Sequence, residues 1–348
     1  MKNPIHTSID FHAPGLQRGV LEVPNSYNLS GWAQVLLPVQ VMARGEGPTV
    51  LLTAGNHGDE YPGQVGIMRL MRELKLEDIN GRLIMIPVLN PPAAGAATRL
   101  SPLDGKNFNR CFPGDPSGSV SEITADFLSH TLFPMADVVI DLHTGGRGVV
   151  FHPCAHMHWV QDPAQRARMA AATAAFGTDI AFLYADVAGR GLLPTEVEQQ
   201  GKTMVSTELG GGESLNAEIH QLCQGGVRRV LRHLGLLRDG AGEDLPRDGR
   251  PPRWVQALDR EDYVFSPESG LFEPRVALGA DVTAGDVLGA LHFPENPIRE
   301  PVLQRAKSDG VIVAHRGPPL TRQGDILFCL AHDVSAEMRA ELNAKTNV

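Results

Sequence analysis

The sequence feature that most constrains the fold is a regular alternation of short apolar runs with segments of helical spacing. The runs are continuous, as in strands covered on both faces, and occupy residues 50–52, 82–90, 137–143, 180–184 and 203–212, the last opening into glycines. Helical segments lie between them, at residues 61–74, 119–134, 163–177 and 216–237. This alternation predicts an open, largely parallel α/β sheet with helices on both sides. Ligands of such sheets gather beyond the carboxyl ends of the strands.

The length and the last third of the chain predict a second domain. The 348 residues exceed what one hydrophobic core usually serves. Residues 238–253 are polar, rich in glycine and proline, and without periodicity, which indicates a linker. Beyond them, short β-prone runs are punctuated by Gly, Asp and Pro. The sequence therefore predicts an α/β domain over residues 1–237 and a smaller all-β domain over residues 254–348.

The net charge and the amino-terminal residues restrict the kinds of partner that we expect. A formal charge of -9 provides no basic field for a phosphate backbone, so we expect no nucleic-acid partner. The first residues lack the apolar core of a signal peptide, and no stretch approaches the roughly 20 apolar residues that a bilayer requires. Four widely spaced cysteines form no CxxC pair and indicate buried thiols in a reducing compartment. We therefore expect a cytoplasmic protein without a membrane partner.

Two polar phrases at predicted strand ends have the composition of a metal site. In "GNHGDE", His57 and Glu60 are three residues apart on a turn that enters a helix, and in "DLHTGG", His143 closes another strand. Catalytic zinc usually takes three ligands of His and carboxylate type and keeps a fourth position open. Either phrase alone occurs by chance, but their joint occurrence at two strand ends predicts one Zn²⁺ per chain. Asp141, two residues before His143, is placed to orient its imidazole.

A further carboxylate is needed to move a proton in a metal-assisted hydrolysis. Glu208 in "STELGGG" closes a third strand and is the predicted general acid and base, with Glu213 beyond the glycines as the reserve candidate. The glycines beside these motifs are expected to leave room for a substrate. The structural alternative is that Glu208 caps the next segment or pairs with a surface arginine.

Three loop residues are candidates for holding the substrate. Asn109 and Arg110 in "NFNRCFPGD" combine a neutral donor with a rigid cationic fork, which suits a carboxylate. Arg99 is a second cation that could stabilise a developing oxyanion. A purely structural role, as solvated or hydrogen-bonded loop residues, is the alternative for all three.

The phrase "FHPCAHMHW" places four metal-ligand residue types on one face of a strand, namely His152, Cys154, His156 and His158. A second metal site is one interpretation of this alternation. Pocket lining or ordinary packing is the favoured one, because these histidines have no carboxylate partner in the sequence nearby.

The phrases GNHGDE, NFNR, DLHTGG and TELGGG occur in an order that resembles the succinylglutamate desuccinylase/aspartoacylase family, itself similar to zinc carboxypeptidases. Within that family the chain looks most like the deacetylases that act on N-acetyl-diaminobutyrate in ectoine breakdown. The resemblance implies a carboxypeptidase-like catalytic domain with a mixed sheet flanked by helices. It also implies a C-terminal β domain near the mouth of the active site. Residues 270–330 look similar to a biotinyl or lipoyl carrier barrel, but a modifiable lysine is missing at the hairpin tip, since Lys307 is poorly placed. We therefore interpret this barrel-sandwich-like domain as a lid or an assembly surface.

The resemblance also implies roles for individual residues. Zinc would be bound by His57, Glu60 and His143, with Glu208 as general acid/base and Arg99 near the oxyanion, while Asn109 and Arg110 would hold the substrate carboxylate. The predicted activity is removal of a small acyl group, acetyl or succinyl, from an N-acylated amino acid. The alternatives are a zinc carboxypeptidase acting on short peptides and a non-catalytic metabolite-binding protein. The sequence is compatible with a homo-oligomer.

Overall fold

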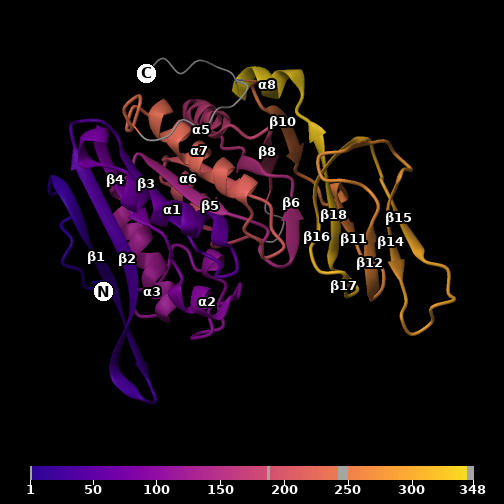
Figure 1. The fold of residues 1–348 in the computed structure, drawn as a ribbon, viewed down its shortest axis with the longest axis horizontal. Coiled ribbons are helices and arrows are strands. Elements are labelled where there is room, and N and C mark those ends of the chain that lie inside the picture. The colour runs from indigo at the N-terminus through magenta and orange to yellow at the C-terminus, as the bar shows by residue number, and fades with distance from the viewer. Residues whose placement is uncertain (1, 186–188, 242–249, 343–348) are drawn as a thin grey trace.

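The computed structural model describes residues 2–185, 189–241 and 250–342 (Figure 1). Within these ranges one mixed sheet of 14 strands crosses the molecule, and a second sheet of four strands lies at its C-terminal end. The long path of the large sheet is, in spatial order, β1 (Gly15–Tyr27), β2 (Ser30–Arg44), β4 (Gly81–Ile86), β3 (Thr49–Ala54), β5 (Val138–His143), β9 (Thr203–Glu208), β7 (Cys154–Met157), β8 (Ile180–Tyr184), β10 (Arg253–Ala257), β18 (Ile326–Asp333), β16 (Gly310–Arg316) and β13 (Asp281–Val282).

The remaining strands build the C-terminal β region. β11 (Tyr263–Phe265) pairs with β18, and β6 (Val149–Phe151) pairs with β16. The small antiparallel sheet runs in the order β15 (Val302–Arg305), β14 (Val287–His292), β12 (Gly270–Pro274) and β17 (Leu320–Thr321). A separate apolar cluster, which includes Phe272, Leu288 and Phe328, packs between the strands of this region. The predicted C-terminal β region is therefore present, and its strands pair antiparallel.

Helices cover the large sheet on both faces. The α-helices are α1 (Tyr61–Glu73), α2 (Pro91–Ala96), α3 (Val120–Phe127), α4 (Phe133–Met135), α5 (Pro163–Phe176), α6 (Leu193–Gln199), α7 (Ala217–His233) and α8 (Ala336–Leu342). A π-helical segment, Leu128–Leu132, joins α3 to α4, so the helix predicted to run to Pro134 is continuous but not regular. Short 3-10 turns lie at Leu76–Asp78, Phe108–Arg110 and Arg260–Asp262.

The central strands β4, β3, β5 and β9 are parallel, and their side chains alternate between two apolar cores. On β3, Leu51 belongs to one core while Val50 and Leu52 belong to the other. Parallel strands end at the same edge of a sheet, so the carboxyl ends of β3, β5 and β9 lie together. The sequence motifs that follow these strands are thereby brought to one place.

The prediction of a largely parallel sheet is wrong for its flanks. β7 runs antiparallel to β9, and β2 runs antiparallel to β4. The N-terminal hairpin β1–β2, at the indigo edge in Figure 1, was not predicted. Its signal is a period-two pattern, since Val35, Leu37, Val39 and Val41 on β2 are buried. The sheet is mixed because the hairpin β1–β2 extends the parallel centre on one side, while β7, β8 and β10, which run opposite to β9, extend it on the other.

The C-terminal region is hydrogen-bonded into the large sheet. β10 pairs in parallel with β8 and antiparallel with β18, so the sheet continues from the α/β part into the β part. Of the predicted linker over residues 238–253, residues 242–249 lie outside the described residues. The division into domains at residues 237 and 254 stays a prediction. Among the described helices, none combines the length and apolar character needed to cross a bilayer.

Gly63 on α1 offers a test of how closely this helix must approach the strand ends. A Cβ at Gly63 would lie 2.6 Å from the Cβ of Leu142 and 2.9 Å from that of Ala54. Because neither Cβ can rotate away, we expect Gly63→Ala to destabilise the protein by about 1–3 kcal/mol, measured by denaturant unfolding. Gly95→Ala on α2 is the control, because no atom lies within 4 Å of its Cβ position. Equal stability of the Gly63→Ala variant and the unsubstituted protein would contradict this packing.

Candidate active site

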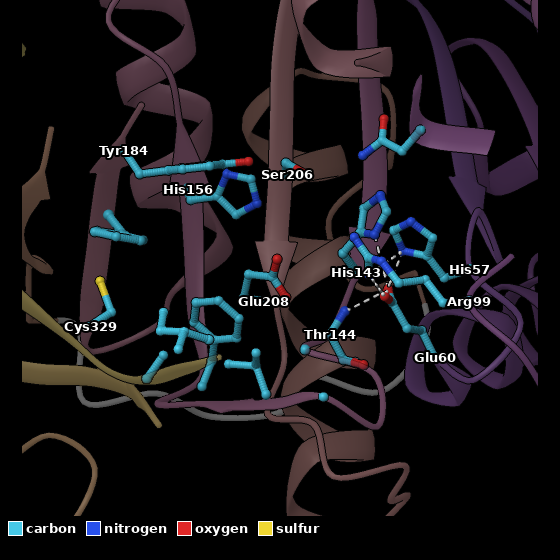
Figure 2. A pocket seen from close by; sticks show the side chains of 18 of the residues that line it. His57, Glu60, Arg99, His143, Thr144, His156, Tyr184, Ser206, Glu208 and Cys329 are labelled. Atoms are coloured by element: carbon cyan, nitrogen blue, oxygen red, sulfur yellow. Dashed lines mark hydrogen bonds and ion pairs between the residues drawn. The ribbon is translucent and has the colours of Figure 1, made fainter. Parts of the chain in front are cut away.

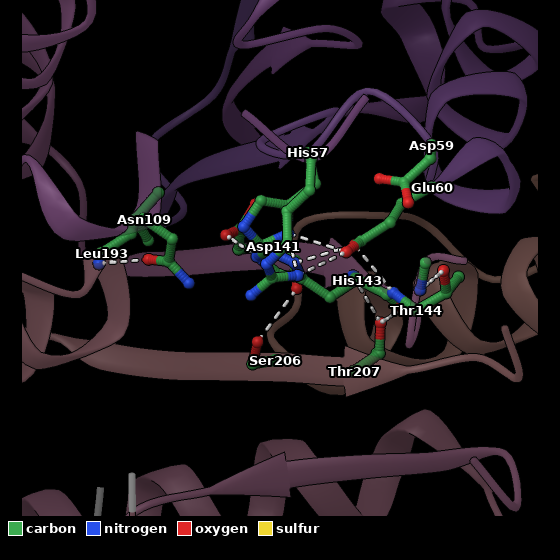
Figure 3. A network of polar contacts seen from close by, with 12 residues as sticks. His57, Asp59, Glu60, Asn109, Asp141, His143, Thr144, Leu193, Ser206 and Thr207 are labelled. Carbon is green, nitrogen blue, oxygen red and sulfur yellow. Dashed lines mark hydrogen bonds and ion pairs between the residues drawn. The ribbon is translucent and has the colours of Figure 1, made fainter. Parts of the chain in front are cut away.

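His57, Glu60 and His143 meet at the edge where β3 and β5 end (Figure 3). His57 and Glu60 come from the turn between β3 and α1, and His143 is the last residue of β5. The Nδ1 atom of His57 lies 2.7 Å from Oε1 of Glu60, and Nδ1 of His143 lies 2.9 Å from Oε2. One ligand atom from each residue lies within 4.8 Å of the other two, and all three residues are buried. The structure thus brings together the three residues predicted as metal ligands.

The contacts on the far side of each ring test whether this group fits zinc. Nε2 of His143 donates to Oδ2 of Asp141 at 2.8 Å, and Oδ1 of Asp141 accepts from Thr53 at 2.7 Å. Nε2 of His57 donates to Oδ1 of Asn107 at 3.0 Å. Histidine ligands of zinc characteristically donate their second ring nitrogen to such acceptors, which fixes the tautomer and the ring orientation. Both Nδ1 atoms are therefore directed at the Glu60 carboxylate, and the donor set fits a zinc ion. Asn107 was missed by the sequence analysis.

Burial and mutual charge determine the pKa values of the three residues. Burial would raise the pKa of Glu60, but the imidazoles of His57 and His143 outweigh it and hold that pKa below its ordinary value. Burial lowers the pKa of His57. Burial also acts to lower the pKa of His143, yet the carboxylates of Asp141 and Glu60 raise it well above its ordinary value. An ionised carboxylate between two imidazoles is a favourable environment for a cation.

Glu208 lies beside this group at the end of β9, in register with His143 on β5. Its Oε2 atom is buried and has no hydrogen-bond partner among the described residues. Burial, with the nearby charge of Glu60, raises the pKa of Glu208 to about 8. A bound cation would lower that value by favouring the carboxylate. The buried Oε2 atom of Glu208, without a partner, is therefore available to bind a proton beside the candidate metal ligands.

The reserve candidate Glu213 is paired with other residues outside the pocket. Its two carboxylate oxygens accept from the guanidinium of Arg147, each at 2.7 Å, and Oε1 also accepts from Tyr61 at 3.3 Å. Glu213 does not line the pocket that contains the other site residues. The structure therefore favours Glu208 as the carboxylate that can act on a substrate.

All seven predicted site residues line one pocket of about 420 Å³. Nη1 of Arg99 lies 3.7 Å from Oε1 of Glu60 and 3.3 Å from Nδ1 of His57. Oδ1 of Asn109 accepts from the backbone N–H of Leu193 at 2.8 Å, and Arg110 donates to the carbonyl of Asn109 at 2.7 Å. The contacts of Arg99 place one cation beside the three ligands, while Asn109 and Arg110 contact each other and Leu193 at the lining of the same pocket.

Figure 2 shows the side of the pocket that lies across Glu208 from the ligands. The sequence analysis assigned no role to this side. His156, Phe182, Tyr184 and Ser206 line it from β7, β8 and β9, and further residues come from the C-terminal β region, namely Tyr263, Ala314, Ile326 and Cys329. The β region therefore contributes to the lining of the pocket. Of the alternating histidines only His156 lines the pocket, and no second cluster that could hold a metal occurs among the described residues.

The glycines beside the motifs allow close packing of the chain, and one of them, Gly145, also lines the pocket. A Cβ at Gly58 would lie 2.0 Å from the carbonyl of Ala93, and one at Gly145 or Gly211 would lie 2.2 or 2.0 Å from the carbonyl of Val149. These are backbone atoms, which cannot give way as a flexible side chain can. The turns that carry the site residues therefore lie directly against neighbouring backbone.

A three-ligand group with a free carboxylate, at the carboxyl edge of an α/β sheet, is typical of metal-dependent hydrolases. Residues 46–234 match the family model described as the succinylglutamate desuccinylase/aspartoacylase catalytic domain. A curated relative, the N-alpha-acetyl-L-2,4-diaminobutyric acid deacetylase of Halomonas elongata, is 41% identical over 96% of both chains. The chain belongs to the succinylglutamate desuccinylase/aspartoacylase family, and the prediction of this family is confirmed.

Two solved structures are similar over nearly the whole chain. One is the product-bound structure of the ectoine utilization protein EutE (DoeB) from Ruegeria pomeroyi, with a TM-score of 0.90, 38% identity, and coverage of 95% of this chain and 100% of that chain. The other is a succinylglutamate desuccinylase/aspartoacylase from Rhodobacter sphaeroides, with a TM-score of 0.89, 39% identity, and coverage of 95% and 99%. The fold shared with these proteins includes the C-terminal β region.

Asp141 should govern the affinity for zinc without being a ligand. We expect Asp141→Asn to weaken zinc binding roughly 10- to 100-fold, because the amide no longer fixes the His143 ring as a charged acceptor does. Competition with a chromophoric chelator measures this affinity. Asp137→Asn is the matched control, since Asp137 immediately precedes β5 and accepts from the N–H of Thr49 at the opposite end of the strand. Unchanged affinity in the Asp141→Asn variant would show that the imidazole needs no such orientation.

Proposed function

We propose that this protein is a zinc-dependent amidohydrolase that removes a small acyl group from an N-acylated amino acid. The observation that carries the proposal is the convergence of His57, Glu60 and His143 beside the unpartnered carboxyl group of Glu208. Family membership supports the reaction class. When held by the three ligands, zinc would polarise an acyl carbonyl and lower the pKa of a water molecule.

Glu208 is the proposed general acid and base. Its free Oε2 atom accepts a proton from the attacking water and returns it to the leaving nitrogen. The nitrogen therefore leaves the acyl carbon as a neutral amine. The pocket position of Glu208, in register with His143, supports this transfer next to the ligand group. The β9 strand holds the carboxyl group on a rigid element.

Arg99, Asn109 and Arg110 are proposed to bind the charged parts of the substrate. The guanidinium of Arg99, 3.7 Å from Glu60, lies close to where negative charge develops on the acyl oxygen during attack. Asn109 uses its Oδ1 on the backbone of Leu193, which leaves its amide N–H groups as donors toward the pocket that it lines. With Arg110, this amide suits the α-carboxylate of an amino acid.

The substrate we propose is an N-acetylated diaminobutyrate or a close analogue, with a succinylated amino acid as the nearest alternative. The name of the Halomonas elongata relative supports the first. Residues of the C-terminal β region line part of the pocket, and a pocket of about 420 Å³ favours a small molecule over a peptide. All four cysteines are free thiols, in keeping with the proposed reducing cytoplasm.

A panel of substrates tests the activity as a whole. We expect the zinc-loaded protein to release acetate from N-acetyl-diaminobutyrate faster than succinate from N-succinyl amino acids, and not to cleave unacylated dipeptides. Chelation should abolish release and added zinc should restore it, because the attacking water depends on the ion. Product release is followed by chromatography. Dipeptide cleavage without deacylation would favour a carboxypeptidase, and binding without any turnover would favour a metabolite-binding protein.

Replacing the proposed acid and base should separate catalysis from metal binding. We expect Glu208→Gln to lower kcat roughly 100- to 10,000-fold while zinc remains stoichiometric, because Gln keeps the shape but cannot exchange a proton. Steady-state kinetics and metal analysis measure the two effects. Glu213→Gln, which alters the ion pair with Arg147 outside the pocket, is the control and should retain activity. Full activity of the Glu208→Gln variant would end the assignment.

A further inference from the structure

The pocket has two chemically different sides, separated by Glu208 (Figure 2). On one side lie the three ligands with Arg99, whose guanidinium is close to Glu60 and His57. On the other lies what we call the distal arm, formed by His156, Phe182, Tyr184, Ser206 and Cys329. None of these five residues is a Lys or an Arg. None of the roles proposed above uses this side of the pocket.

The distal arm is built on rigid elements. His156 on β7 is paired in register with Ser206 on β9 and with Phe182 on β8. Partners in register point to the same side of a sheet, so these three side chains form one row across adjacent strands. The ring of Tyr184 is in contact with those of His156 and Phe182, at centroid distances of 4.8 and 5.6 Å. The positions of these groups are therefore fixed before a substrate enters.

The distal arm offers hydrogen-bond acceptors that lack donors. His156 is only 3% exposed, and its Nδ1 atom has no partner among the described residues. Burial holds the pKa of His156 well below its ordinary value, so the ring is neutral and has one nitrogen without a proton. The hydroxyl of Ser206 donates a hydrogen bond to the carbonyl of Asp141 at 3.2 Å, so the Oγ atom of Ser206 can still accept one. Oε2 of Glu208, at the boundary of the arm, is also without a partner.

Unpaired buried acceptors are costly, and a group that supplies several N–H donors removes that cost. A primary ammonium has three such donors, and aromatic rings such as those of Phe182 and Tyr184 attract a cation. An acetyl methyl group has no donor, and a succinyl carboxylate would bring further acceptors. The lining of the distal arm therefore matches an amine better than it matches either acyl group.

We propose that the distal arm binds a primary ammonium on the side chain of the substrate's amino-acid half, and that Nδ1 of His156 accepts a hydrogen bond from it. This inference rests on the proposed function, because it assigns the substrate carboxylate to Asn109 and Arg110 and the scissile amide to the metal centre. The second amino group of diaminobutyrate, the amino acid in the name of the Halomonas elongata relative, has the required chemistry. His156 thus determines specificity for amine-bearing substrates.

The test compares N-acetyl-2,4-diaminobutyrate with N-acetylnorvaline, in which a methyl group replaces the ammonium. For the zinc-loaded protein we expect the ratio of kcat/KM values to favour the amine at least roughly tenfold. His156→Leu should reduce that ratio to near one, while His156→Asn, whose Oδ1 can take the place of Nδ1, should restore part of it. His152→Leu is the matched control and should keep the ratio, because His152 belongs to the same run of alternating histidines but does not line the pocket.

Calorimetric titration with free 2,4-diaminobutyrate and norvaline, in zinc-loaded and chelated protein, provides a readout independent of turnover. We expect tighter binding of diaminobutyrate, lost in His156→Leu and partly regained in His156→Asn. An equal fall in kcat/KM for both substrates in His156→Leu, which leaves their ratio unchanged, would overturn the inference. So would a changed preference between acetyl and propionyl groups with the same amino acid, since it would assign the arm to the acyl group. If the unsubstituted protein deacylates neither substrate, the proposed function fails first.

Discussion

The buried carboxylate of Glu60 is the interaction on which the site depends. A charge in such a position is stable only if it is paired and hydrogen-bonded on all sides. His57 and His143 contact its two oxygens, and the N–H of Thr144 donates to Oε2 at 3.0 Å. These partners lie on the turn after β3 and at the end of β5, so the carboxylate links two neighbouring strand ends. Asp141 and Asn107 then orient the two rings from behind.

Close backbone packing makes this convergence possible. The turn that carries His57 and Glu60 lies against Ala93 through Gly58, and α1 lies against Leu142 through Gly63. The loops after β5 and β9 both lie against the carbonyl of Val149, through Gly145 and Gly211. A Cβ at any of these positions would overlap the neighbouring atoms and force the segments apart. Glycine next to each motif is therefore a requirement of the scaffold that holds the ligands.

The parts of the site that the sequence predicted are those fixed by local structure. His57, Glu60, His143 and Glu208 each follow directly from a short apolar run, and parallel strands necessarily bring such ends to one edge. The direction of β7 could not be predicted in this way, because a strand of four residues has little periodicity of its own. The contribution of Cys329 to the pocket depends on β18, which returns to the sheet beside β10 after a separate β region has formed. Such long-range pairing leaves no local pattern in the sequence.

The residues proposed for the chemistry and those proposed for specificity lie on different parts of the sheet. The ligands and Glu208 lie on the parallel centre of the sheet, where strand order and register fix them together. The far side of the pocket is lined from the reversed strand β7, from β8 and from the C-terminal strands β11, β16 and β18. Under the proposed roles, substitutions on those elements would change the group that the pocket accepts while the elements that carry the candidate ligands keep their pairing. One hydrolytic centre would then serve different acylated amino acids.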